Sequence, residues 1–534
     1  MSDDVRADVI VVGAGIAGAL AANGLARKGV DVAVLEAGPP VDRPDAVLRF
    51  QLSAARVPES AYEDVSYAPR PTVLEPRGYY VQSGPELFQS TYERRVGGTT
   101  WHWLGTALRL VPNDFRLRNA YGRGVDWPIT YDELEPWYGR AERAIGVSGV
   151  DSLGLGAPRS TPYPMPPIPQ SYLDGRFTKA AAKLGLEVSA TPQARNSEAH
   201  DGRPACCGNA SCIPICPIGA KYDASVTVAE AKRHGVRVVD SAVAHDVAVT
   251  PENVVVRFLT PDGEEHIASG RTLVLAANAI ETPKLMLLSR RGTHRTGLGN
   301  GNDLVGRHLM DHPTQLSWAL APEPVYPFRG PLSTSGIEVL RDGAFRRRRG
   351  AFRIEIGNDG WSWPKGDPTV QAVAEASSTL GPDGLRSLGK RLARQIRVAS
   401  LVEPLRDREN RVQPSEKRDS LGIPRPEISY RTGGYARAGL AEARRVHERL
   451  FAAIGATEVE HWNGPQGAGH IMGTCPMGED PRTSVVDRDL RVHGHRNCFV
   501  LGSAVFPTVG TANPTLTIAA LSLRAVDAIR SSLS

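Results

Sequence analysis

Two apolar runs near the start of the chain flank an alanine-rich segment. Ala7 to Val12 reads ADVIVV, a β-branched pattern that is typical of a strand buried on both faces of a parallel sheet. The segment 17–28 has the composition of a helix, and Gly29 follows it as a stop signal. Val30 to Leu35 (VDVAVL) then predicts a second buried strand, which Glu36 closes. The pattern therefore predicts a strand–helix–strand unit.

The turn before the predicted helix has three glycines, Gly13, Gly15 and Gly18, in the order GxGxxG. Gly13 permits a tight turn, Gly15 lets the backbone approach a pyrophosphate, and Gly18 allows the helix to pack closely on the strand. The free N–H groups at the helix N-terminus attract the phosphates. Glu36 can accept hydrogen bonds from a ribose diol. Together these features predict a dinucleotide-binding site rather than a chance glycine-rich turn.

This fingerprint alone does not distinguish FAD from NAD. The unit begins close to the N-terminus, and a second strand-like segment, Cys498 to Leu501, runs into Gly502 and Ser503 near the C-terminus. Many flavoproteins return to the isoalloxazine ring with their C-terminal segment. We therefore expect FAD, with Gly502 and Ser503 among the residues that bind it.

Composition and charge exclude several classes of protein. The chain has 534 residues, of which 41% are hydrophobic and 23% charged, and its formal net charge is +5. Its densest basic run, Arg346 to Arg349, has no interleaved aromatic residues, which predicts a solvated loop and no nucleic-acid partner. No apolar stretch approaches the ~18 residues that span a bilayer. Met1 to Ala7 lacks the features of a signal peptide, so the sequence by itself predicts a cytoplasmic protein.

Four of the cysteines, Cys206, Cys207, Cys212 and Cys216, lie close together in a stretch rich in Gly, Asn and Pro. Such clustering without a signal peptide favours a metal or cluster site over a disulfide framework. Pro217 follows the last cysteine, as in many ferredoxin-type sequences. A structural zinc site and buried thiols are the alternatives, although zinc commonly takes CxxC pairs, which are absent here.

Several further motifs, spaced along most of the chain, resemble those of one enzyme family. They are RVGGTTWHW from Arg95 to Trp103, LAANAIETPKLMLLS from Leu275 to Ser289, HIMGTCPMG from His470 to Gly478 and GSAVFPTVGTANPTLTIAAL from Gly502 to Leu521. With the dinucleotide fingerprint, they identify the chain as similar to the glucose–methanol–choline (GMC) oxidoreductases. The resemblance implies an α/β (α+β) protein with a Rossmann-like FAD-binding domain and a second, antiparallel-sheet substrate domain. Only residues 320–465 are not diagnostic.

We expect the FAD-binding domain to be discontinuous. It takes residues 1–45, 90–125, 225–315 and 466–534. Residues 126–195 are proline-rich and predict a connection that wraps the surface, and 196–224 form a cysteine-cluster insertion. The substrate domain is expected in 316–465.

Within the family, the chain is most similar to the FAD-dependent catalytic subunits of bacterial membrane-linked dehydrogenases of glucose, gluconate, sorbitol or fructose. The runs GGTTWHW, WPITYDELEPWY from Trp127 and CCGNASCIPICPIGA from Cys206 carry this resemblance. It implies oxidation of a hydroxyl of a sugar, sugar acid or polyol by hydride transfer to the flavin. It also implies a [3Fe-4S] cluster on Cys206, Cys212 and Cys216, which passes electrons to a cytochrome c-type acceptor.

The same resemblance implies a small companion subunit that carries the export signal, which would give a periplasmic or membrane-associated complex. The alternative is a pyranose or glycoside oxidase of the same fold, which reduces oxygen and needs no cluster.

The resemblance also assigns roles in the active site. His470 matches the histidine that takes the proton from the alcohol, and its ordinary pKa of ~6.5 suits a base near neutral pH. Asn513 matches the second member of the catalytic pair and can hold the substrate oxygen through hydrogen bonds.

In the TWHW region, Gly98, Thr99, His102 and Trp103 are expected to contact the flavin. His102 matches the histidine that carries a covalent flavin bond in related pyranose oxidases. A non-covalent contact is the equal alternative here.

Overall fold

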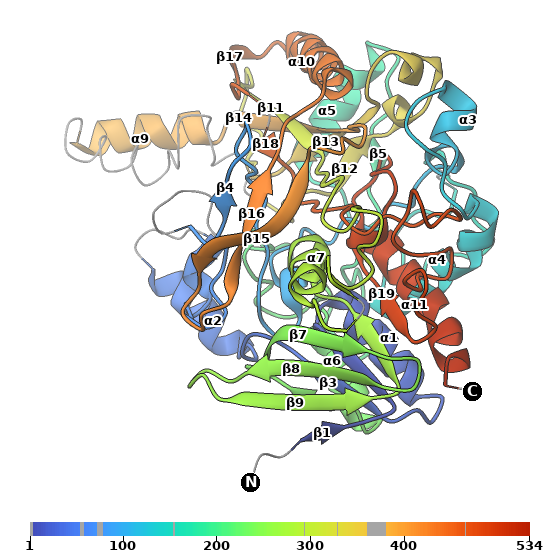
Figure 1. Cartoon of the computed structure of the whole chain (residues 1–534). Coiled ribbons are helices and arrows are strands. Elements are labelled where there is room, and N and C mark those ends of the chain that lie inside the picture. Colours follow the sequence, from blue (N-terminus) through green and yellow to red (C-terminus); the bar gives the residue numbers. More distant parts are fainter. Residues whose placement is uncertain are drawn as a thin grey trace.

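A parallel sheet forms the centre of one half of the molecule (Figure 1). The computed structural model describes residues 4–53, 58–71, 78–152, 155–292, 294–327, 329–359, 381–464 and 466–533. The strands of this sheet lie in the order β19 (Cys498–Val500), β10 (Thr272–Leu275), β2 (Val9–Val12), β3 (Val32–Leu35) and β6 (Arg237–Val239), with every neighbouring pair parallel. β2, β3, β10 and β19 are buried along their whole length, which explains their apolar sequences. The predicted strand–helix–strand unit is confirmed, with α1 (Ile16–Ala26) between β2 and β3.

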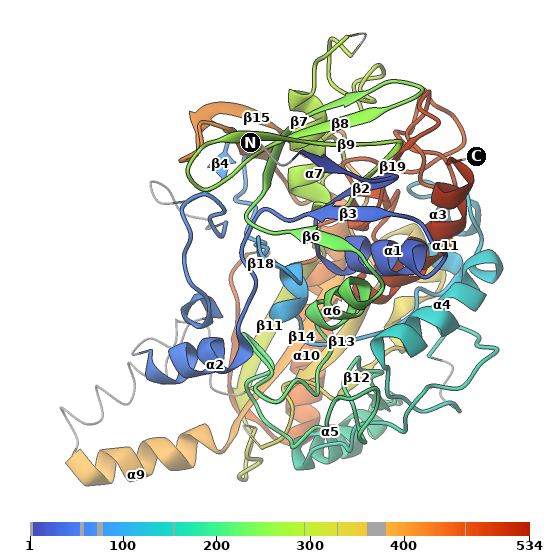
Figure 2. The same cartoon turned by 90° about the horizontal axis from the view of Figure 1, so that it is seen from below.

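Each face of the parallel sheet is covered by a different layer. α1 packs against α6 (Ser225–Arg233) and α11 (Thr515–Ser531), and α11 packs against α4 (Tyr131–Ile145). The other face is covered by a sheet in the order β1 (Val5–Arg6), β9 (Glu265–Gly270), β8 (Val254–Leu259) and β7 (Val243–Val249). Figure 2 shows the parallel sheet between these two layers. The Rossmann-like half of the predicted fold is therefore present.

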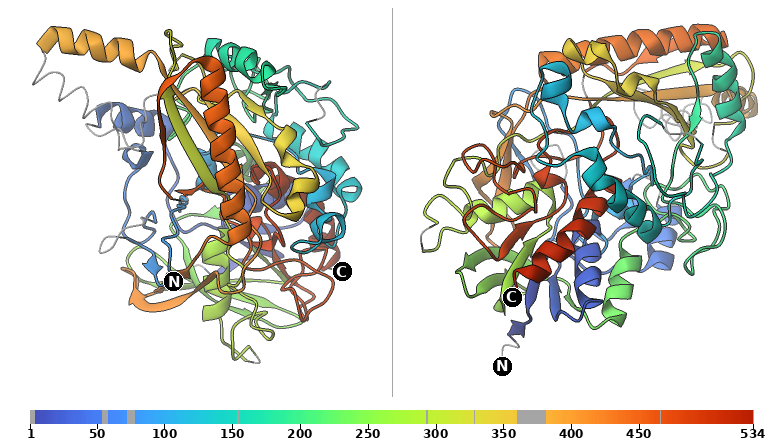
Figure 3. Two further views of the ribbon diagram at one scale, coloured as in Figure 1. Left: turned by 90° about the horizontal axis from the view of Figure 1, so that it is seen from above. Right: turned by 90° about the vertical axis from the view of Figure 1, so that its right-hand side faces the viewer.

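The second half of the fold is an antiparallel sheet. Its order is β17 (Thr457–His461), β11 (Pro313–Leu320), β14 (Gln395–Val402), β13 (Phe352–Gly357), β12 (Ser335–Ile337) and β5 (Ser189–Ala190), and β18 (Gln466–Gly467) also pairs with β11. The helix α10 (Gly434–Ile454) lies along the outer face of this sheet, beside α5 (Tyr172–Ala182) (Figure 3). The antiparallel sheet predicted from the resemblance is confirmed.

Smaller elements complete the chain. A third sheet has the order β15 (Arg411–Arg418), β16 (Pro424–Ser429) and β4 (Val81–Gln82). The described residues also form the α-helices α2 (Arg43–Leu52), α3 (Leu117–Tyr121), α7 (Asn278–Leu288) and α9 (Gly381–Leu392). α9 projects from the body of the molecule (Figure 1). The 3-10 helices are η1 (Pro58–Ala61), η2 (Gly98–Trp101), η3 (Pro112–Asp114), η4 (Val339–Arg341), η5 (Ala344–Arg347) and η6 (Ser503–Val505). Within the described ranges, none of the helices has the length and apolar content to traverse a bilayer.

Candidate active site

A cavity of about 490 Å³ lies where the parallel and antiparallel sheets meet. Val12 and Leu35, at the carboxyl ends of β2 and β3, line it from one side, which is where open parallel sheets bind ligands. All the cofactor-binding and catalytic residues expected from the sequence, except Gly18, line the cavity. They are Gly13, Gly15, Glu36, Gly98, Thr99, His102, Trp103, His470, Gly502, Ser503 and Asn513. The fold thus brings residues from distant parts of the chain to one place.

Two of the three glycines in the loop stand where a side chain would clash with the backbone, and the third borders open space. Gly13 has φ +108°, and a Cβ there would lie 2.6 Å from the Ala276 carbonyl oxygen. A Cβ on Gly18 would lie 1.9 Å from the Gly13 carbonyl oxygen, so this glycine permits the contact between α1 and the turn. At Gly15, by contrast, a Cβ would meet no protein atom within 4 Å. Gly15 therefore borders open cavity at the N-terminus of α1, where phosphate oxygens can meet unpaired N–H groups.

Glu36 closes this side of the cavity. Its carboxylate accepts hydrogen bonds from the backbone N–H groups of Ala14 (2.7 Å) and Gly38 (3.2 Å). Burial raises the pKa of Glu36, and these hydrogen bonds act against the rise. The glutamate thus connects the glycine loop to the chain after β3, and it lies where a ribose could contact it.

The opposite wall contains the TWHW region. Gly98 lies close to the glycine loop, because a Cβ on it would be 3.1 Å from the Cα of Gly15. His102 Nδ1 is 3.2 Å from Glu93 Oε1. Burial raises the pKa of Glu93, but the hydrogen bond with His102 and the charges of His102, Arg70 and Arg95 outweigh burial and hold that pKa at about 2. An ionised Glu93 therefore orients the His102 ring at the cavity wall.

The antiparallel sheet forms the third wall, and its strands alternate between two environments. Thr314 and Leu316 of β11 line the cavity, whereas Ser317 bonds to His447 of α10 on the other face. Glu355 of β13 and Arg397 of β14 also line the cavity. These cavity residues fall in or beside the region whose sequence was not diagnostic, because only the register of the strands decides which face each side chain takes.

His470 and Asn513 meet at the cavity. His470 Nε2 is 3.2 Å from Asn513 Nδ2, and the two residues come from separate loops near the C-terminus. Burial lowers the pKa of His470 well below 6.5, and the neighbouring His312 ring and the charge of Arg353 lower it further. His470 is therefore neutral near pH 7, which is the state that a base requires.

Sequence reasoning missed two residues that hold His470. The Asp311 carboxylate accepts the backbone N–H of His470 at 3.0 Å and a hydrogen bond from the Ser90 hydroxyl. His312 Nδ1 is 3.0 Å from His470 Nδ1, and His312 Nε2 is 3.1 Å from the Gly510 carbonyl oxygen. Asp311 and His312 immediately precede β11, far from His470 in sequence, so no local pattern connected them to the site.

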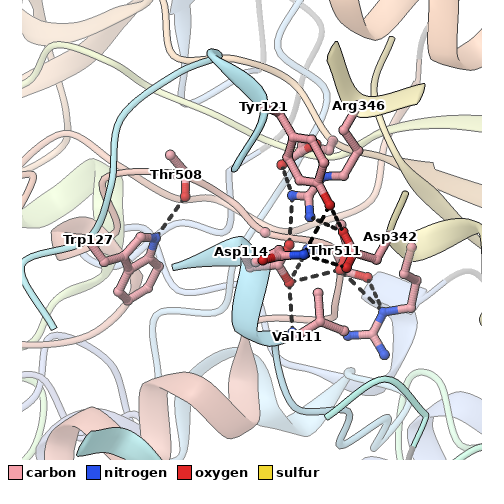
Figure 4. A network of polar contacts seen from close by, with 12 residues as sticks. Val111, Asp114, Tyr121, Trp127, Asp342, Arg346, Thr508 and Thr511 are labelled. Atoms are coloured by element: carbon pink, nitrogen blue, oxygen red, sulfur yellow. Dashed lines mark hydrogen bonds and ion pairs between the residues drawn. The ribbon is translucent and has the colours of Figure 1, made fainter. Parts of the chain in front are cut away.

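The loop that carries Asn513 is held by a buried ionic network (Figure 4). Asp114 accepts hydrogen bonds from the Thr511 backbone N–H (3.3 Å) and hydroxyl (2.9 Å), and it pairs with Arg346 at 2.8 Å. Arg346 also pairs with Glu403 at 2.6 Å. The prediction of a solvated basic loop was wrong for Arg346, which is 0% exposed, because its carboxylate partners are distant in sequence and invisible in a run of arginines.

Most of the chain matches the models of one protein family. The family model described as GMC oxidoreductase matches residues 94–314 with its N-terminal part and 406–522 with its C-terminal part. A model described as FAD dependent oxidoreductase matches residues 8–46, which include the glycine loop. This chain belongs to the GMC oxidoreductase family. It is therefore an FAD-dependent oxidoreductase that acts on CH–OH donors, as the sequence resemblance predicted.

Relatives of this GMC oxidoreductase include both dehydrogenases and oxidases. The chain is 38% identical to the fructose dehydrogenase large subunit of Gluconobacter japonicus, over 100% of this chain and 99% of the relative. It is 31% identical to paromamine 6'-oxidase of Streptomyces fradiae, over 99% and 92% of the two chains. Pyridoxine 4-oxidase from Mesorbium loti has the same fold, with a TM-score of 0.64, 18% identity and coverage of 98% and 99%. A formate oxidase structure gives a TM-score of 0.67 at 16% identity, with 99% of each chain covered.

The residues of this GMC oxidoreductase fit FAD. The open space at Gly15 and the N-terminus of α1, which no side chain caps, suit the pyrophosphate. Glu36 would hold the ribose, and His102 and Trp103 with Gly502 and Ser503 would surround the flavin ring. The cavity lining thus has residues that could contact the pyrophosphate, the ribose and the flavin ring of the cofactor.

The cysteine loop of this GMC oxidoreductase lies next to the cavity. Ile213 lines the cavity, and the Lys221 ammonium donates hydrogen bonds to the carbonyl oxygens of Trp101 (2.8 Å) and Trp103 (2.6 Å). Trp103 Nε1 in turn donates to the Tyr222 carbonyl oxygen at 2.7 Å. The loop and the TWHW wall are therefore directly connected.

The structure does not show the expected iron–sulfur site. Cys212 and Cys216 are buried, Cys206 is partly buried and Cys207 is exposed. Among the described residues, no group of three or more His, Cys, Asp or Glu side chains is arranged to hold a metal ion. Burial raises the pKa of Cys206, and the charges of Cys212 and Cys216 contribute to the rise. The cluster therefore stays a prediction.

Proposed function

We propose that this GMC oxidoreductase oxidises a hydroxyl group of a sugar, sugar acid or polyol. The observation that carries the proposal is a pair of buried carboxamide oxygens, Asn513 Oδ1 and Gln466 Oε1, on residues that line the cavity. Neither oxygen has a hydrogen-bond partner among the described residues. Each buried acceptor without a donor costs about 1–3 kcal/mol, which a substrate with several hydroxyl groups can recover. The name of the relative from Gluconobacter japonicus, which acts on fructose, agrees with this substrate class.

The two catalytic residues have distinct tasks in this proposal. His470 takes the hydroxyl proton at Nε2, because burial keeps its ring neutral. Asn513 holds the substrate oxygen beside it, through its amide. When bound, FAD supplies the acceptor for the hydride that leaves the carbon bearing the reacting hydroxyl. Asn513 is buried and His470 is partly buried, which limits the access of water to the reacting hydroxyl.

Anaerobic titration of the purified FAD-loaded protein with a panel of alcohols tests this substrate class. We expect a ketose, aldose, sugar acid or polyol to bleach the flavin absorption, and simple alkanols of the same concentration to leave it unchanged. A polyhydroxylated substrate can donate hydrogen bonds to both buried oxygens, whereas a simple alkanol has a single hydroxyl to donate. Bleaching by ethanol or butanol but by no sugar or polyol would contradict the proposal.

We further propose that the electrons leave through a [3Fe-4S] cluster on Cys206, Cys212 and Cys216. The three sulfurs accept hydrogen bonds from Gly208 N–H (3.4 Å), Arg195 Nη2 (3.2 Å) and Lys221 N–H (3.5 Å), respectively. N–H donors of this kind stabilise thiolates and tune iron–sulfur clusters. Cys207 is exposed, so we do not expect it to bind the cluster.

The charges around the loop support an anionic group. Arg195 is 1% exposed and its Nη1 has no partner among the described residues, although Nη2 bonds to Cys212. Lys221 is also 1% exposed, and burial lowers its pKa to about 8 while the thiols of Cys212 and Cys216 oppose that change. The buried carboxylate near Lys221, Asp223, is itself paired with Arg43 at 2.6 Å. Ionised sulfurs or an anionic cluster would supply further negative charge beside these two buried cations.

A cluster implies an external protein acceptor, for which we propose a cytochrome c-type carrier. The relative that is named a large subunit implies a companion subunit. We propose that such a companion assembles with this chain and directs its export to the periplasmic side of the membrane. Co-expression with and without the companion, followed by cell fractionation, tests the location.

Replacing Cys212 with serine is expected to separate the two halves of the reaction. Flavin bleaching by the substrate should change less than about twofold, because His470 and Asn513 are untouched. Electron transfer to the carrier protein should fall by about tenfold or more, because serine is a poor ligand for iron–sulfur centres. Stopped-flow bleaching and steady-state cytochrome reduction measure the two rates separately.

Cys207→Ser is the matched control, because Cys207 is exposed and next to a proposed ligand. It should leave both rates unchanged. Equal loss of both rates in Cys212→Ser would contradict the relay. Oxygen consumption as fast as flavin bleaching would instead support an oxidase, the class to which the relative from Streptomyces fradiae belongs by name.

A further inference from the structure

A backbone carbonyl decides the proton arrangement of His312. His312 is 1% exposed, and its Nε2 lies 3.1 Å from the Gly510 carbonyl oxygen. A carbonyl oxygen only accepts hydrogen bonds, so Nε2 must carry the hydrogen. Burial lowers the pKa of His312 to about 4, and the Gly510 bond and the Asp114 charge oppose that change. The ring is therefore neutral at pH 7, and its Nδ1 has a free lone pair.

The free lone pair of His312 faces His470. The two Nδ1 atoms are 3.0 Å apart, and the rings meet edge to face at 85°. One nitrogen of such a pair must donate and the other must accept. Since His312 Nδ1 has no hydrogen, His470 Nδ1 carries it, and His470 Nε2 is then left bare toward Asn513. The consecutive hydrogen bonds that connect Gly510, His312 and His470 thus select one tautomer of His470.

We propose that His312 is a positioning residue that keeps His470 in the tautomer with a free Nε2, the atom that takes the substrate proton. The inference rests on the proposed function, because it requires His470 to be the base. Without His312, the hydrogen of His470 can move to Nε2, and that nitrogen would then be unable to accept the proton of the alcohol.

The same contact also supports the charged state of His470. When Nε2 takes the hydroxyl proton, the ring becomes a cation in a buried site, which the positive charge of Arg353 disfavours. The His470 Nδ1–H bond to the neutral His312 then becomes charge-assisted and stronger. The other charged groups near the pair are Asp311, which accepts the His470 backbone N–H, and Asp114 beside His312. Neither contacts His470 Nδ1 in the described structure, so His312 is the partner of that atom.

Three substitutions of His312 separate positioning from packing. His312→Leu removes both ring nitrogens. His312→Gln places its amide near the Nε2 position and can keep the bond to Gly510, but it offers no acceptor to His470 Nδ1. His312→Asn places its amide near the Nδ1 position and can accept that hydrogen bond. A purely structural role would rank Gln and Asn alike, and positioning ranks Asn well above Gln.

We expect His312→Leu and His312→Gln to lower kcat by about 10²-fold, because a loss of this size is typical when a residue that orients a functional histidine is removed. KM should change less than about threefold. His312→Asn should recover kcat to within about tenfold of the unsubstituted enzyme. Nitrogen-15 NMR of histidine-labelled protein reads the tautomer directly: His470 should show a protonated Nδ1 in the native protein and in His312→Asn, and a mixture in His312→Gln. Thermal unfolding and flavin content identify any variant that fails to fold.

Equal kcat values in His312→Gln and His312→Asn, or an unchanged His470 tautomer in His312→Gln, would overturn the inference. His470→Ala separates this failure from failure of the proposed function. If His470→Ala loses turnover while His312→Gln behaves as the native enzyme, His470 is the base and only the role of His312 is wrong. If His470→Ala keeps turnover, His470 is not the base and the proposed mechanism is wrong. A native enzyme whose flavin is bleached by no sugar, sugar acid or polyol would contradict the proposed function itself.

Discussion

Replacement of His470 by alanine is expected to lower kcat by about 10³- to 10⁴-fold, the upper part of the range for loss of a general base. His470 Nε2 lies at the cavity, 3.2 Å from the Asn513 amide. The adjacent His312 does not line the cavity, so it is not placed to substitute for His470. KM should change little, because the orphaned oxygens of Asn513 and Gln466 are kept. Anaerobic stopped-flow bleaching of the flavin by the best sugar measures the loss.

His266→Ala is a suitable control for this experiment. His266 stacks on Phe258 in the sheet that covers the far face of the parallel strands, outside the cavity. Both variants should retain their flavin and thermal stability, so that a loss confined to His470→Ala reports on chemistry. Turnover of His470→Ala within about threefold of the native rate would refute the assignment.

The pH dependence of kcat/KM in the native enzyme tests the role of His470 independently. Because burial lowers the pKa of His470 well below 6.5, its basic form persists as the pH falls through 6.5. The acid limb of kcat/KM assigned to His470 is therefore expected below that value. His470→Ala should lack this limb.

Two alanine substitutions in the glycine loop are expected to fail for different reasons. Gly18→Ala would place a methyl group 1.9 Å from the Gly13 carbonyl oxygen, which no rotamer can relieve. We expect loss of about 3 kcal/mol or more of unfolding free energy, or no soluble protein, because α1 would have to move off β2. Gly15→Ala meets no protein atom within 4 Å, so the apoprotein should fold normally. It should lose flavin instead, because the methyl group occupies the space for the pyrophosphate.

Thermal unfolding of the apoprotein and the flavin content of the purified protein distinguish the two outcomes. Gly175→Ala is the control, because this glycine lies within α5 and a Cβ there meets no atom within 4 Å. That variant should keep its flavin and gain up to about 1 kcal/mol in stability from better helix propensity. A Gly15→Ala protein with native flavin affinity would contradict the placement of the pyrophosphate at α1.

Much of the fold and of the candidate site could be predicted from short segments. Local apolar periodicity predicts the strand–helix–strand unit, and Gly13 and Gly18 stand where a Cβ would clash with backbone atoms near the turn. His470 and Asn513 were found because each lies within a motif of its own. The resemblance carried by these motifs was sufficient to place the chain in its family.

Other features depended on contacts between segments that the sequence does not connect. Arg346 lies in a basic run that resembles a surface loop, yet it is buried against Asp114 and Glu403. The cysteine spacing predicted a cluster, but spacing alone does not determine whether three sulfurs converge, and the described residues show no metal site. Burial and convergence are properties of packing, which a single segment cannot report.

The sequence by itself thus determined the cofactor class, the family and the two residues at which the reaction is proposed to occur, because these depend on local backbone geometry and on compact motifs. Only the tertiary structure decided how His470 is held and protonated. His312 and Gly510 are separated by 198 residues, and their hydrogen bond exists because the antiparallel sheet and the C-terminal loops pack together at one cavity. The physical reason is that a tautomer is set by the partner of the opposite ring nitrogen, and that partner comes from another part of the fold.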